Sequence, residues 1–241
     1  MKTPTSYPTL LEMFYRFEKG KANQVFLSEP IAGKPLAHTW EEAGFSIRKM
    51  AGALFALNLP AGSRIAIIGK NSAHWIMADL AVTMAGHVSV PIYPTVTAST
   101  LRQILTHSES QVLFVGKLDA FEPLQSGIPS NVRSIHFPHW AWSGCEHWNT
   151  FIENADAILT DTIPDPQTLS CILYTSGTTG DPKGVMHTHF AHSFSLLTVM
   201  EALGEDLQNE VFFSYLPLSH IAERMVVEYC GIFTGGTIYF P

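Results

Sequence analysis

The sequence predicts an α/β fold built from stacked helix–strand units with mostly parallel sheets. Two observations predict it. Short apolar segments rich in β-branched residues alternate with longer segments of helical periodicity through most of the chain. These short segments contain few polar residues, which is typical of strands that are buried on both faces of a parallel sheet. We therefore expect helices on both faces of that sheet.

The first predicted elements are a strand pair and a helix. Residues 24–40 read as two short strands around a Gly/Pro turn. Thr39 precedes Glu42 by three positions, which is a capping-box pattern, so a helix is expected over about residues 40–58. Its predicted core face carries Phe45, Met50, Ala53, Leu54 and Leu57.

The elements that follow alternate in type. Further strands are predicted over residues 64–69, 87–93, 111–116, 132–137, 168–174, 210–216 and 237–240. Further helices are predicted over residues 72–86, 98–108, 188–203 and 219–233. The helix over 72–86 has few polar residues, so we expect it to be buried on several sides.

A polar, Pro-rich stretch interrupts this alternation. We interpret about residues 155–167 as a linker between a first lobe, about residues 1–155, and a second lobe, about residues 168–241. The pattern continues to Pro241 without a polar tail. We therefore expect residues 1–241 to be a fragment of a longer protein.

Composition narrows the class of protein. The formal net charge is −7, from 14 basic and 21 acidic residues, so no basic field suggests a nucleic-acid partner. Cys145, Cys171 and Cys230 are far apart and odd in number, which favours reduced, buried thiols in a cytoplasmic protein. No uncharged apolar stretch approaches the ~20 residues of a membrane-spanning helix. Peripheral membrane contact stays open.

The segment YTSGTTGDPKGV, residues 174–185, has the composition of a phosphate-binding loop. Its glycines let backbone N–H groups point into a shared concavity, its hydroxyls add donors, and Lys183 adds a positive charge. A strand before it and a helix after it would place the loop at the carboxyl end of a sheet. The spacing fits neither a Walker A loop nor a dinucleotide fingerprint. The alternative is an exposed turn without function.

Three segments carry a resemblance to a known family. YTSGTTGDPKGVMHTH resembles the signature phosphate-binding loop of adenylate-forming enzymes, which include acyl-CoA synthetases, luciferases and peptide-synthetase adenylation domains. MAGHVSVPIYPT, residues 84–95, is similar to an early strand and turn of that fold. YLPLSHIAER, residues 215–224, is similar to a downstream motif in the form typical of long-chain fatty acyl-CoA synthetases. The resemblance implies the first part of the family's N-terminal domain.

The resemblance also implies roles for individual residues. His220 corresponds to a residue beside the substrate carboxylate and the acyl channel, and it is our candidate catalytic residue; the alternative is that it only caps or packs. The residues that would hold the β- and γ-phosphates of ATP are Thr175, Ser176, Gly177, Thr178, Thr179, Gly180 and Lys183.

The implied activity is that of a long-chain fatty acid–CoA ligase, which uses ATP, Mg²⁺ and coenzyme A and passes through an acyl-adenylate. The family motifs for the Mg²⁺ ligand, the ribose contact and a C-terminal lysine are absent, so residues 1–241 are expected to be inactive alone. Two alternatives stay open. The enzyme could use another carboxylate or a carrier-protein acceptor, or the chain could be a non-catalytic nucleotide-binding fragment. Exposed apolar surface would favour a homo-oligomer.

Two histidine-rich clusters invite a metal-binding interpretation that we do not favour, and we expect no metal-ligating set in this chain. Their spacing matches no common zinc pattern, and interleaved tryptophans suggest a packed surface loop for the first. The clusters are His136, His139, Cys145 and His147, and His187, His189 and His192.

Overall fold

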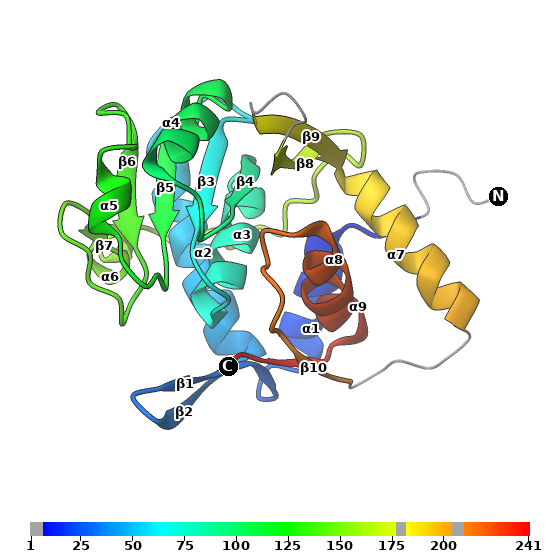
Figure 1. Ribbon diagram of the computed structural model, residues 1–241. Helices are drawn as coiled ribbons and strands as arrows, with labels where there is room; N and C mark the ends of the chain where they lie inside the picture. The colour runs from blue at the N-terminus through cyan, green and yellow to red at the C-terminus, as the bar shows by residue number, and fades with distance from the viewer. Residues whose placement is uncertain (1–6, 177–181, 204–209) are drawn as a thin grey trace.

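The large sheet confirms the predicted α/β class. The computed structural model describes residues 7–176, 182–203 and 210–241. Its large sheet has the strand order β7-β6-β5-β3-β4-β8-β9, and all neighbours pair in parallel except β8 and β9 (Figure 1). The strands are β3 (Arg64–Ile68), β4 (Val88–Ile92), β5 (Val112–Val115), β6 (Arg133–His136), β7 (Glu146–His147), β8 (Leu169–Ser176) and β9 (Pro182–Thr188).

Helices cover both faces of this sheet, as predicted. Alternate residues of β3 enter two separate cores: Ile65 and Ile67 pack with one set of helices, and Ala66 and Ile68 with the other. The first set comprises α2 (Trp40–Phe55), α3 (Ala73–Met84) and α6 (Trp148–Ile152). The second set comprises α4 (Ala98–His107) and α5 (Glu122–Gln125). Every residue of α3 is buried, which confirms the expectation for that helix.

A small second sheet joins two early strands of the chain with two late ones. Its order is β10-β11-β1-β2, formed by β1 (Val25–Ile31), β2 (Lys34–Thr39), β10 (Val211–Phe213) and β11 (Thr237–Tyr239). Leu27 of β1 pairs in parallel with Ile238 of β11. The β1–β2 turn is Ala32-Gly33, and both residues have positive φ, as a two-residue hairpin turn requires.

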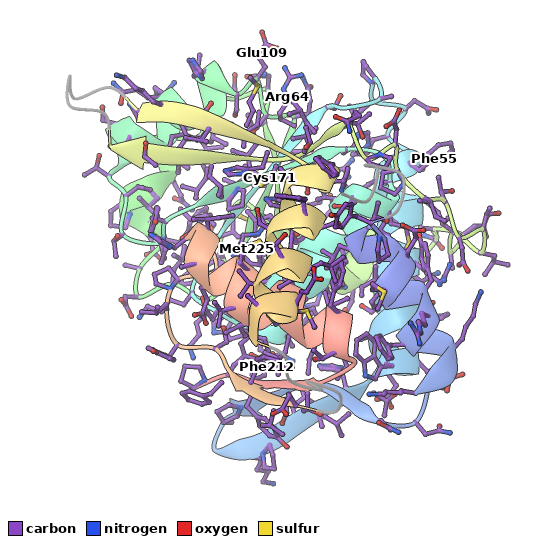
Figure 2. The ribbon with its side chains drawn as sticks, turned by 90° about the vertical axis from the view of Figure 1, so that its right-hand side faces the viewer. Phe55, Arg64, Glu109, Cys171, Phe212 and Met225 are labelled. Atoms are coloured by element: carbon purple, nitrogen blue, oxygen red, sulfur yellow. The ribbon has the colours of Figure 1, made fainter. Side chains whose placement is uncertain are left out.

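The capping box predicted at Thr39 is confirmed. The Thr39 side chain accepts from the backbone N–H of Glu42, and the Glu42 carboxylate accepts from the backbone N–H of Thr39. The same motif at Thr9 begins α1 (Leu10–Gly20), a helix that we did not predict. The predicted core face of α2 is wrong at Phe45, which is 62% exposed. Phe55, at the end of the same helix, also projects away from the body of the molecule (Figure 2).

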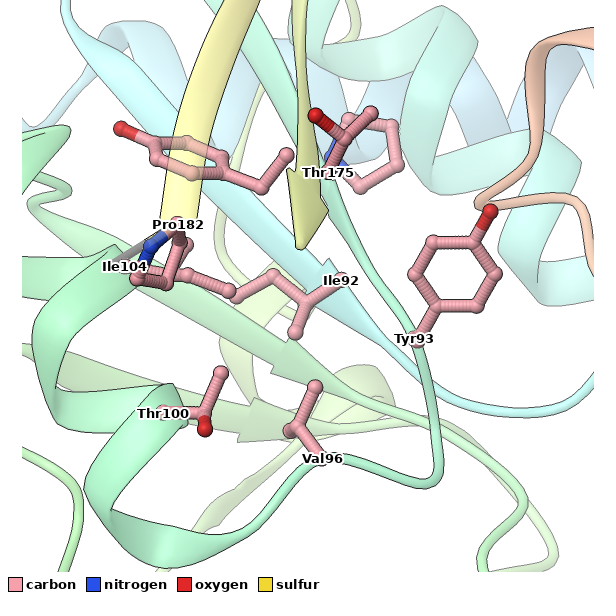
Figure 3. A pocket seen from close by; sticks show the side chains of 9 residues that line it. Ile92, Tyr93, Val96, Thr100, Ile104, Thr175 and Pro182 are labelled. Carbon is pink, nitrogen blue, oxygen red and sulfur yellow. The ribbon is translucent and has the colours of Figure 1, made fainter. Parts of the chain in front are cut away.

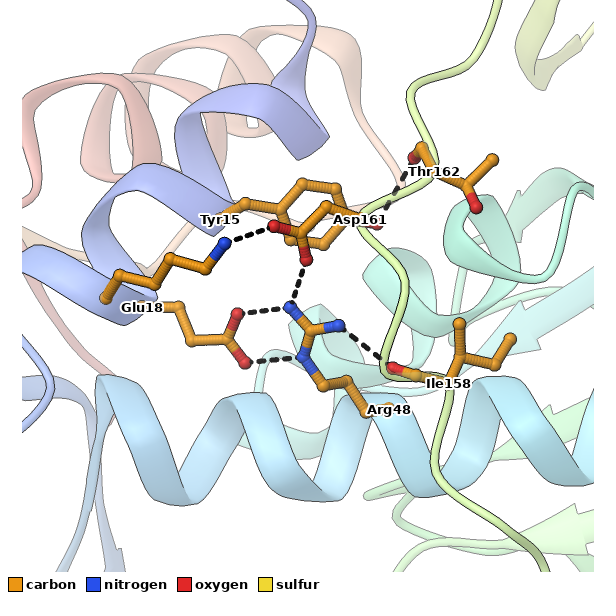
Figure 4. Close-up of polar contacts among 7 residues, drawn as sticks. Tyr15, Glu18, Arg48, Ile158, Asp161 and Thr162 are labelled. Atoms are coloured by element: carbon orange, nitrogen blue, oxygen red, sulfur yellow. Dashed lines mark hydrogen bonds and ion pairs between the residues drawn. The ribbon is translucent and has the colours of Figure 1, made fainter.

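The predicted linker has no helix or strand from residue 155 to 167, and it is held tightly against α1 and α2. Arg48 of α2 donates to Glu18 of α1, to Asp161 at 2.7 Å and to the carbonyl of Ile158 at 2.9 Å (Figure 4). The hydroxyl of Tyr15 donates to the carbonyl of Thr162. Strands on both sides of this segment belong to one sheet, because β8 pairs with β4. The division into two lobes stays a prediction.

The helix predicted over residues 219–233 is interrupted. It consists of α8 (Ile221–Glu223), a π-helical turn (Arg224–Tyr229) and α9 (Cys230–Thr234). Because the π turn bonds i to i+5, the side chains around it no longer follow the 3.6-residue period that we assumed. Val226, an apolar residue within this turn, is 61% exposed. No helix in the described part of the chain is long and apolar enough to cross a membrane.

Candidate functional site

The described ends of the signature segment belong to an antiparallel strand pair. β8 ends at Ser176, β9 begins at Pro182, and these two residues pair with each other. The helix predicted over residues 188–203 is confirmed as α7 (His189–Leu203), and the seven residues of β9 before it are a strand that we did not predict. The segment PKGVMHT contains Pro and Gly, which are depleted in strands, and its apolar residues do not alternate with polar ones, so β9 was not predicted.

Two contacts fix the pairing of β8 with β9. Gly184 lies opposite Tyr174, and a Cβ at Gly184 would meet Ile172 and the Tyr174 ring. A glycine here lets the Tyr174 ring lie across the neighbouring strand. The Tyr174 hydroxyl is 2.7 Å from Nδ1 of His107 in α4, so the strand pair is attached to the helix beside it.

The structure describes the side chains of two residues of the predicted phosphate site, Thr175 and Lys183. They occupy opposite positions on β8 and β9, and both are exposed. Among the described residues, none accepts a hydrogen bond from Nζ of Lys183 or pairs with it. A cation and a hydroxyl beside each other at a loop base can both bind phosphate oxygens.

A pocket of about 420 Å³ opens beside this pair (Figure 3). It lies between the carboxyl end of β4, the first turns of α4 and the end of β8. Its lining is mostly apolar, with a few hydroxyl groups: Pro91, Ile92, Tyr93, Val96, Thr100, Ile104, Tyr174, Thr175 and Pro182. No carboxylate is among the described residues that line the pocket.

His220 lies on the same side of the molecule as the pocket. Its Nδ1 accepts a hydrogen bond of 3.1 Å from the backbone N–H of Ala222, so it is the N-cap of α8. Its ring is exposed and lies edge-on to Tyr93, with 6.5 Å between ring centroids. His220 therefore caps the helix, which was the alternative to a catalytic role, and its other ring nitrogen, Nε2, is not used in this cap. The catalytic role of His220 stays a prediction.

The structure brings only part of the predicted set together. Thr175 and Lys183 are paired, Thr175 and Tyr93 both line the pocket, and the Tyr93 ring contacts the ring of His220. Gly177, Thr178, Thr179 and Gly180 lie outside the described residues, as does the side chain of Ser176. We did not single out Tyr93, although it lies in one of the three motifs. Its position directly after a buried parallel strand was the available signal.

A chain of buried polar groups runs beneath the β8–β9 pair. Arg224 is fully buried and lies 2.5 Å from Asp79 of α3, and Tyr229 lies 2.9 Å from Nδ1 of His192. Nε2 of His192 is 3.9 Å from the sulfur of Cys171 in β8. Burial, with Arg224 nearby, lowers the pKa of His192 to about 2, and burial raises the pKa of the Cys171 thiol to about 12. These groups join α3, α7 and the π turn to β8.

In each histidine-rich cluster two rings are in contact. The rings of His136 and His147 are perpendicular, with 4.8 Å between their centroids, and the ring of His187 stacks on that of His192. In residues 7–176, 182–203 and 210–241, no three His, Cys, Asp or Glu side chains are arranged to hold a metal ion.

Solved structures share this arrangement of elements. An anthranilate CoA ligase in complex with anthranoyl-AMP superposes with a TM-score of 0.82 at 19% identity, over 99% of this chain and 46% of that one. Acetoacetyl-CoA synthetase from Streptomyces lividans gives 0.80 at 23% identity, over 96% of this chain and 38% of that one. The fold is therefore the N-terminal part of the adenylate-forming fold.

Sequence comparison gives the family. The family described as AMP-binding enzyme matches residues 16–241, and the chain belongs to it. A long-chain-fatty-acid–CoA ligase of Homo sapiens, ACSBG2, is 30% identical over 83% of this chain and 33% of its own length. Long chain acyl-CoA synthetase 5 of Arabidopsis thaliana is 28% identical over 89% of this chain and 35% of its own length. The chain thus spans about a third of the length of these relatives.

Proposed function

We propose that this chain is the nucleotide-binding part of an ATP-dependent ligase that activates a fatty acid and transfers it to coenzyme A. The observation that carries the proposal is the pairing of Thr175 with Lys183 at the base of the signature loop. The carboxyl ends of β4 and β8 meet there, which is where open α/β sheets bind their ligands.

The proposed reaction has two steps. A carboxylate oxygen attacks the α-phosphorus of ATP, the bond to the bridging oxygen of the β-phosphate breaks, and pyrophosphate leaves. The thiolate of coenzyme A then attacks the acyl carbon, and AMP leaves. In the first step Lys183 and the loop would hold the β- and γ-phosphates and stabilise the charge that develops on pyrophosphate. Mg²⁺ would supply further neutralisation of the charge on these phosphates.

Fatty acids are the proposed substrate class for two reasons. The names of the sequence relatives describe long-chain ligases, and residues 215–224 have the long-chain form of their motif. His220 is proposed to lie beside the substrate carboxylate, with Nε2 as the ligand atom because Nδ1 already accepts from Ala222. The cytoplasm, with peripheral contact to the membranes that hold such substrates, is the proposed location.

The test is exchange of labelled pyrophosphate into ATP, catalysed by the full gene product with a panel of carboxylates. We expect exchange with long-chain fatty acids, and release of AMP when coenzyme A is added. Exchange only with aryl, short-chain or amino acids would show that long-chain fatty acids are not the substrate class. Transfer only to a carrier-protein phosphopantetheine would show that coenzyme A is not the acceptor.

Lys183→Met should reduce exchange by about 100-fold or more, because one charge-assisted contact to the leaving group is lost. Lys34→Met, at an exposed position of β2, is the matched control and should leave the rate unchanged. Calorimetric titration of ATP into the 241-residue chain tests nucleotide binding directly. Saturable binding is expected, and no binding would contradict the proposal that these residues are the nucleotide-binding part. A Lys183→Met variant that exchanges pyrophosphate as fast as the wild type would contradict the proposed phosphate site.

A further inference from the structure

A second feature near the pocket is a set of hydrogen bonds that fixes residues 214–218, directly before His220. Asn71 follows β3 by three residues and is only 7% exposed. Its Nδ2 donates to Oγ of Ser214 at 2.8 Å and to the carbonyl of Leu216 at 2.6 Å. Its Oδ1 accepts from the backbone N–H of Leu218 at 2.9 Å. One side chain thus satisfies three polar groups of a segment about 145 residues downstream.

The orientation of this amide is determined by its partners. The Leu218 N–H can only donate and the Leu216 carbonyl can only accept, so oxygen and nitrogen of Asn71 cannot be exchanged. The Ser214 hydroxyl accepts from Asn71 and in turn donates a hydrogen bond of 2.9 Å to Oε1 of Glu223. The donors therefore run in one direction from Asn71 through Ser214 to Glu223.

Glu223 holds the segment from the other side. It lies in α8 and is 3% exposed. Burial raises the pKa of Glu223, whereas the Ser214 hydroxyl and the backbone amides of Tyr215 and Leu216 favour its ionised form. Asn71 and Glu223 together form what we call the 214–218 clamp.

The clamp fixes where His220 lies relative to the large sheet. Asn71 is anchored to that sheet because the backbone N–H of the preceding residue, Lys70, donates to the carbonyl of Lys117, two residues after β5. The segment that it holds continues into His220, whose N–H donates to the carbonyl of Pro217. The ring of His220 reaches Tyr93, which follows β4. The position of the imidazole at the pocket thus depends on hydrogen bonds to a side chain from the end of β3.

We propose that Asn71 is a positioning residue that sets the place of His220 at the substrate carboxylate through the 214–218 clamp. This inference rests on the proposed role of His220, but the clamp itself can be tested without activity. Asn71→Asp keeps the size of the side chain and the acceptor for Leu218. It loses both donors, brings a carboxylate oxygen against the Leu216 carbonyl and competes with Glu223 for the Ser214 proton.

The first test measures the clamp on the 241-residue chain. In Asn71→Ala, hydrogen exchange of the Leu218 amide should accelerate at least about tenfold, since its buried acceptor is lost. The amide of Ile67 in β3 should keep its rate, which separates local from global opening. Nitrogen NMR of the His220 ring should show one tautomer, protonated at Nε2, in the wild type and a mixture in the variant. Unchanged Leu218 exchange and an unchanged tautomer would overturn the proposal.

The second test uses pyrophosphate exchange by the full gene product. Asn71→Asp should lower kcat/KM for the carboxylate about 10- to 100-fold without changing KM for ATP, because a displacement of about 1 Å has that effect on reacting groups. In a His220→Ala background the same substitution should add little, since both act through one group. An equal loss in both backgrounds, or none, would overturn the positioning role.

Two controls complete the design. Asn149→Asp, which makes the same charge change at an exposed position of α6, should change neither readout. If the wild type shows no exchange with any carboxylate, the proposed function fails while the amide and tautomer measurements still decide whether the clamp exists.

Discussion

At the scale of single residues, Glu29 is the clearest case of chemistry set by burial. This carboxyl group of β1 is 4% exposed, and its Oε1 has no hydrogen-bond partner among the described residues. Burial raises the pKa of Glu29 to about 7, although the Ala73 amide and Lys117 act in the opposite direction. The native state therefore holds a proton that the unfolded state releases near pH 4.5.

The stability linked to Glu29 should thus be present below pH 4.5 and lost as the pH rises to 7 and above, because the native state binds more protons in that window. Glu29→Gln cannot ionise, so its free energy of unfolding relative to wild type should rise by about 3 kcal/mol between pH 4.5 and pH 8. Urea unfolding at both pH values measures this. Glu201→Gln, at an exposed position of α7, should show no such trend, and parallel pH profiles for Glu29→Gln and wild type would contradict the argument.

The three thiols should be unreactive in the native protein. All are free; Cys171 is fully buried, and Cys145 and Cys230, contrary to our expectation of full burial, are only partly buried. Burial raises the pKa of Cys145 and Cys230 to about 11 and that of Cys171 to about 12. Because the thiolate is the nucleophile, alkylation at pH 8 should be slow, slowest at Cys171, and fast in urea. Rapid native alkylation of Cys171, identified by peptide mass, would show that β8 opens.

At the scale of elements, the close contact between α2 and the 155–167 segment depends on a glycine. A Cβ at Gly52 would overlap the carbonyl oxygen of Asp156. Lys49, one turn earlier, donates to the carbonyl of Ala155 at 2.5 Å, so the segment cannot move away without losing hydrogen bonds.

Gly52→Ala should therefore destabilise the protein by about 1–3 kcal/mol, although alanine is the better helix former. Thermal unfolding measures the loss. Gly20→Ala is the control, because Gly20 ends α1 with nothing within 4 Å of the added methyl group. A neutral Gly52→Ala would mean that the segment shifts freely and is not held by Arg48 and Lys49.

The elements also show what the sequence can and cannot predict. Buried parallel strands such as β3 and β5 were predictable because their apolar runs are local signals, and Thr39 was predictable because its capping partner is three residues away. The π turn at Arg224–Tyr229 was not predictable, since Arg224 is placed by Asp79, which is distant in sequence. The strand β9 was not predictable for another reason: its Pro and Gly give no local strand signal, and its pairing with β8 places it.

The site follows the same rule. The signature loop and His220 were recognisable as contiguous motifs, whereas Tyr93 and Asn71 owe their positions to the sheet. Asn71 contacts residues about 145 positions away, and no periodicity in the sequence relates them.

At the scale of the whole molecule, the small sheet closes the chain on itself. β1, near the start of the described chain, pairs with β11, and Lys21 donates to the carbonyl of Gly235. One face of this sheet nevertheless stays uncovered in the described structure. The rings of Phe213 and Tyr215 stack on each other there and are 54% and 70% exposed. Val211, two residues before Phe213, and Tyr239, which pairs with Phe213 across the sheet, are also exposed.

We expect the 241-residue chain to self-associate through this face. In the described sheet β10 has β11 on one side only, so its outer edge offers unpaired backbone groups next to exposed aromatic rings. Sedimentation velocity over a concentration series should show reversible growth of the average mass. Phe213→Lys with Tyr215→Lys should weaken association about tenfold or more, because each aromatic ring contributes about 1.5–3 kcal/mol when buried. Phe55→Lys, at another exposed aromatic position, should leave it unchanged, and a chain that stays monomeric at its highest soluble concentration would show that this face needs no cover.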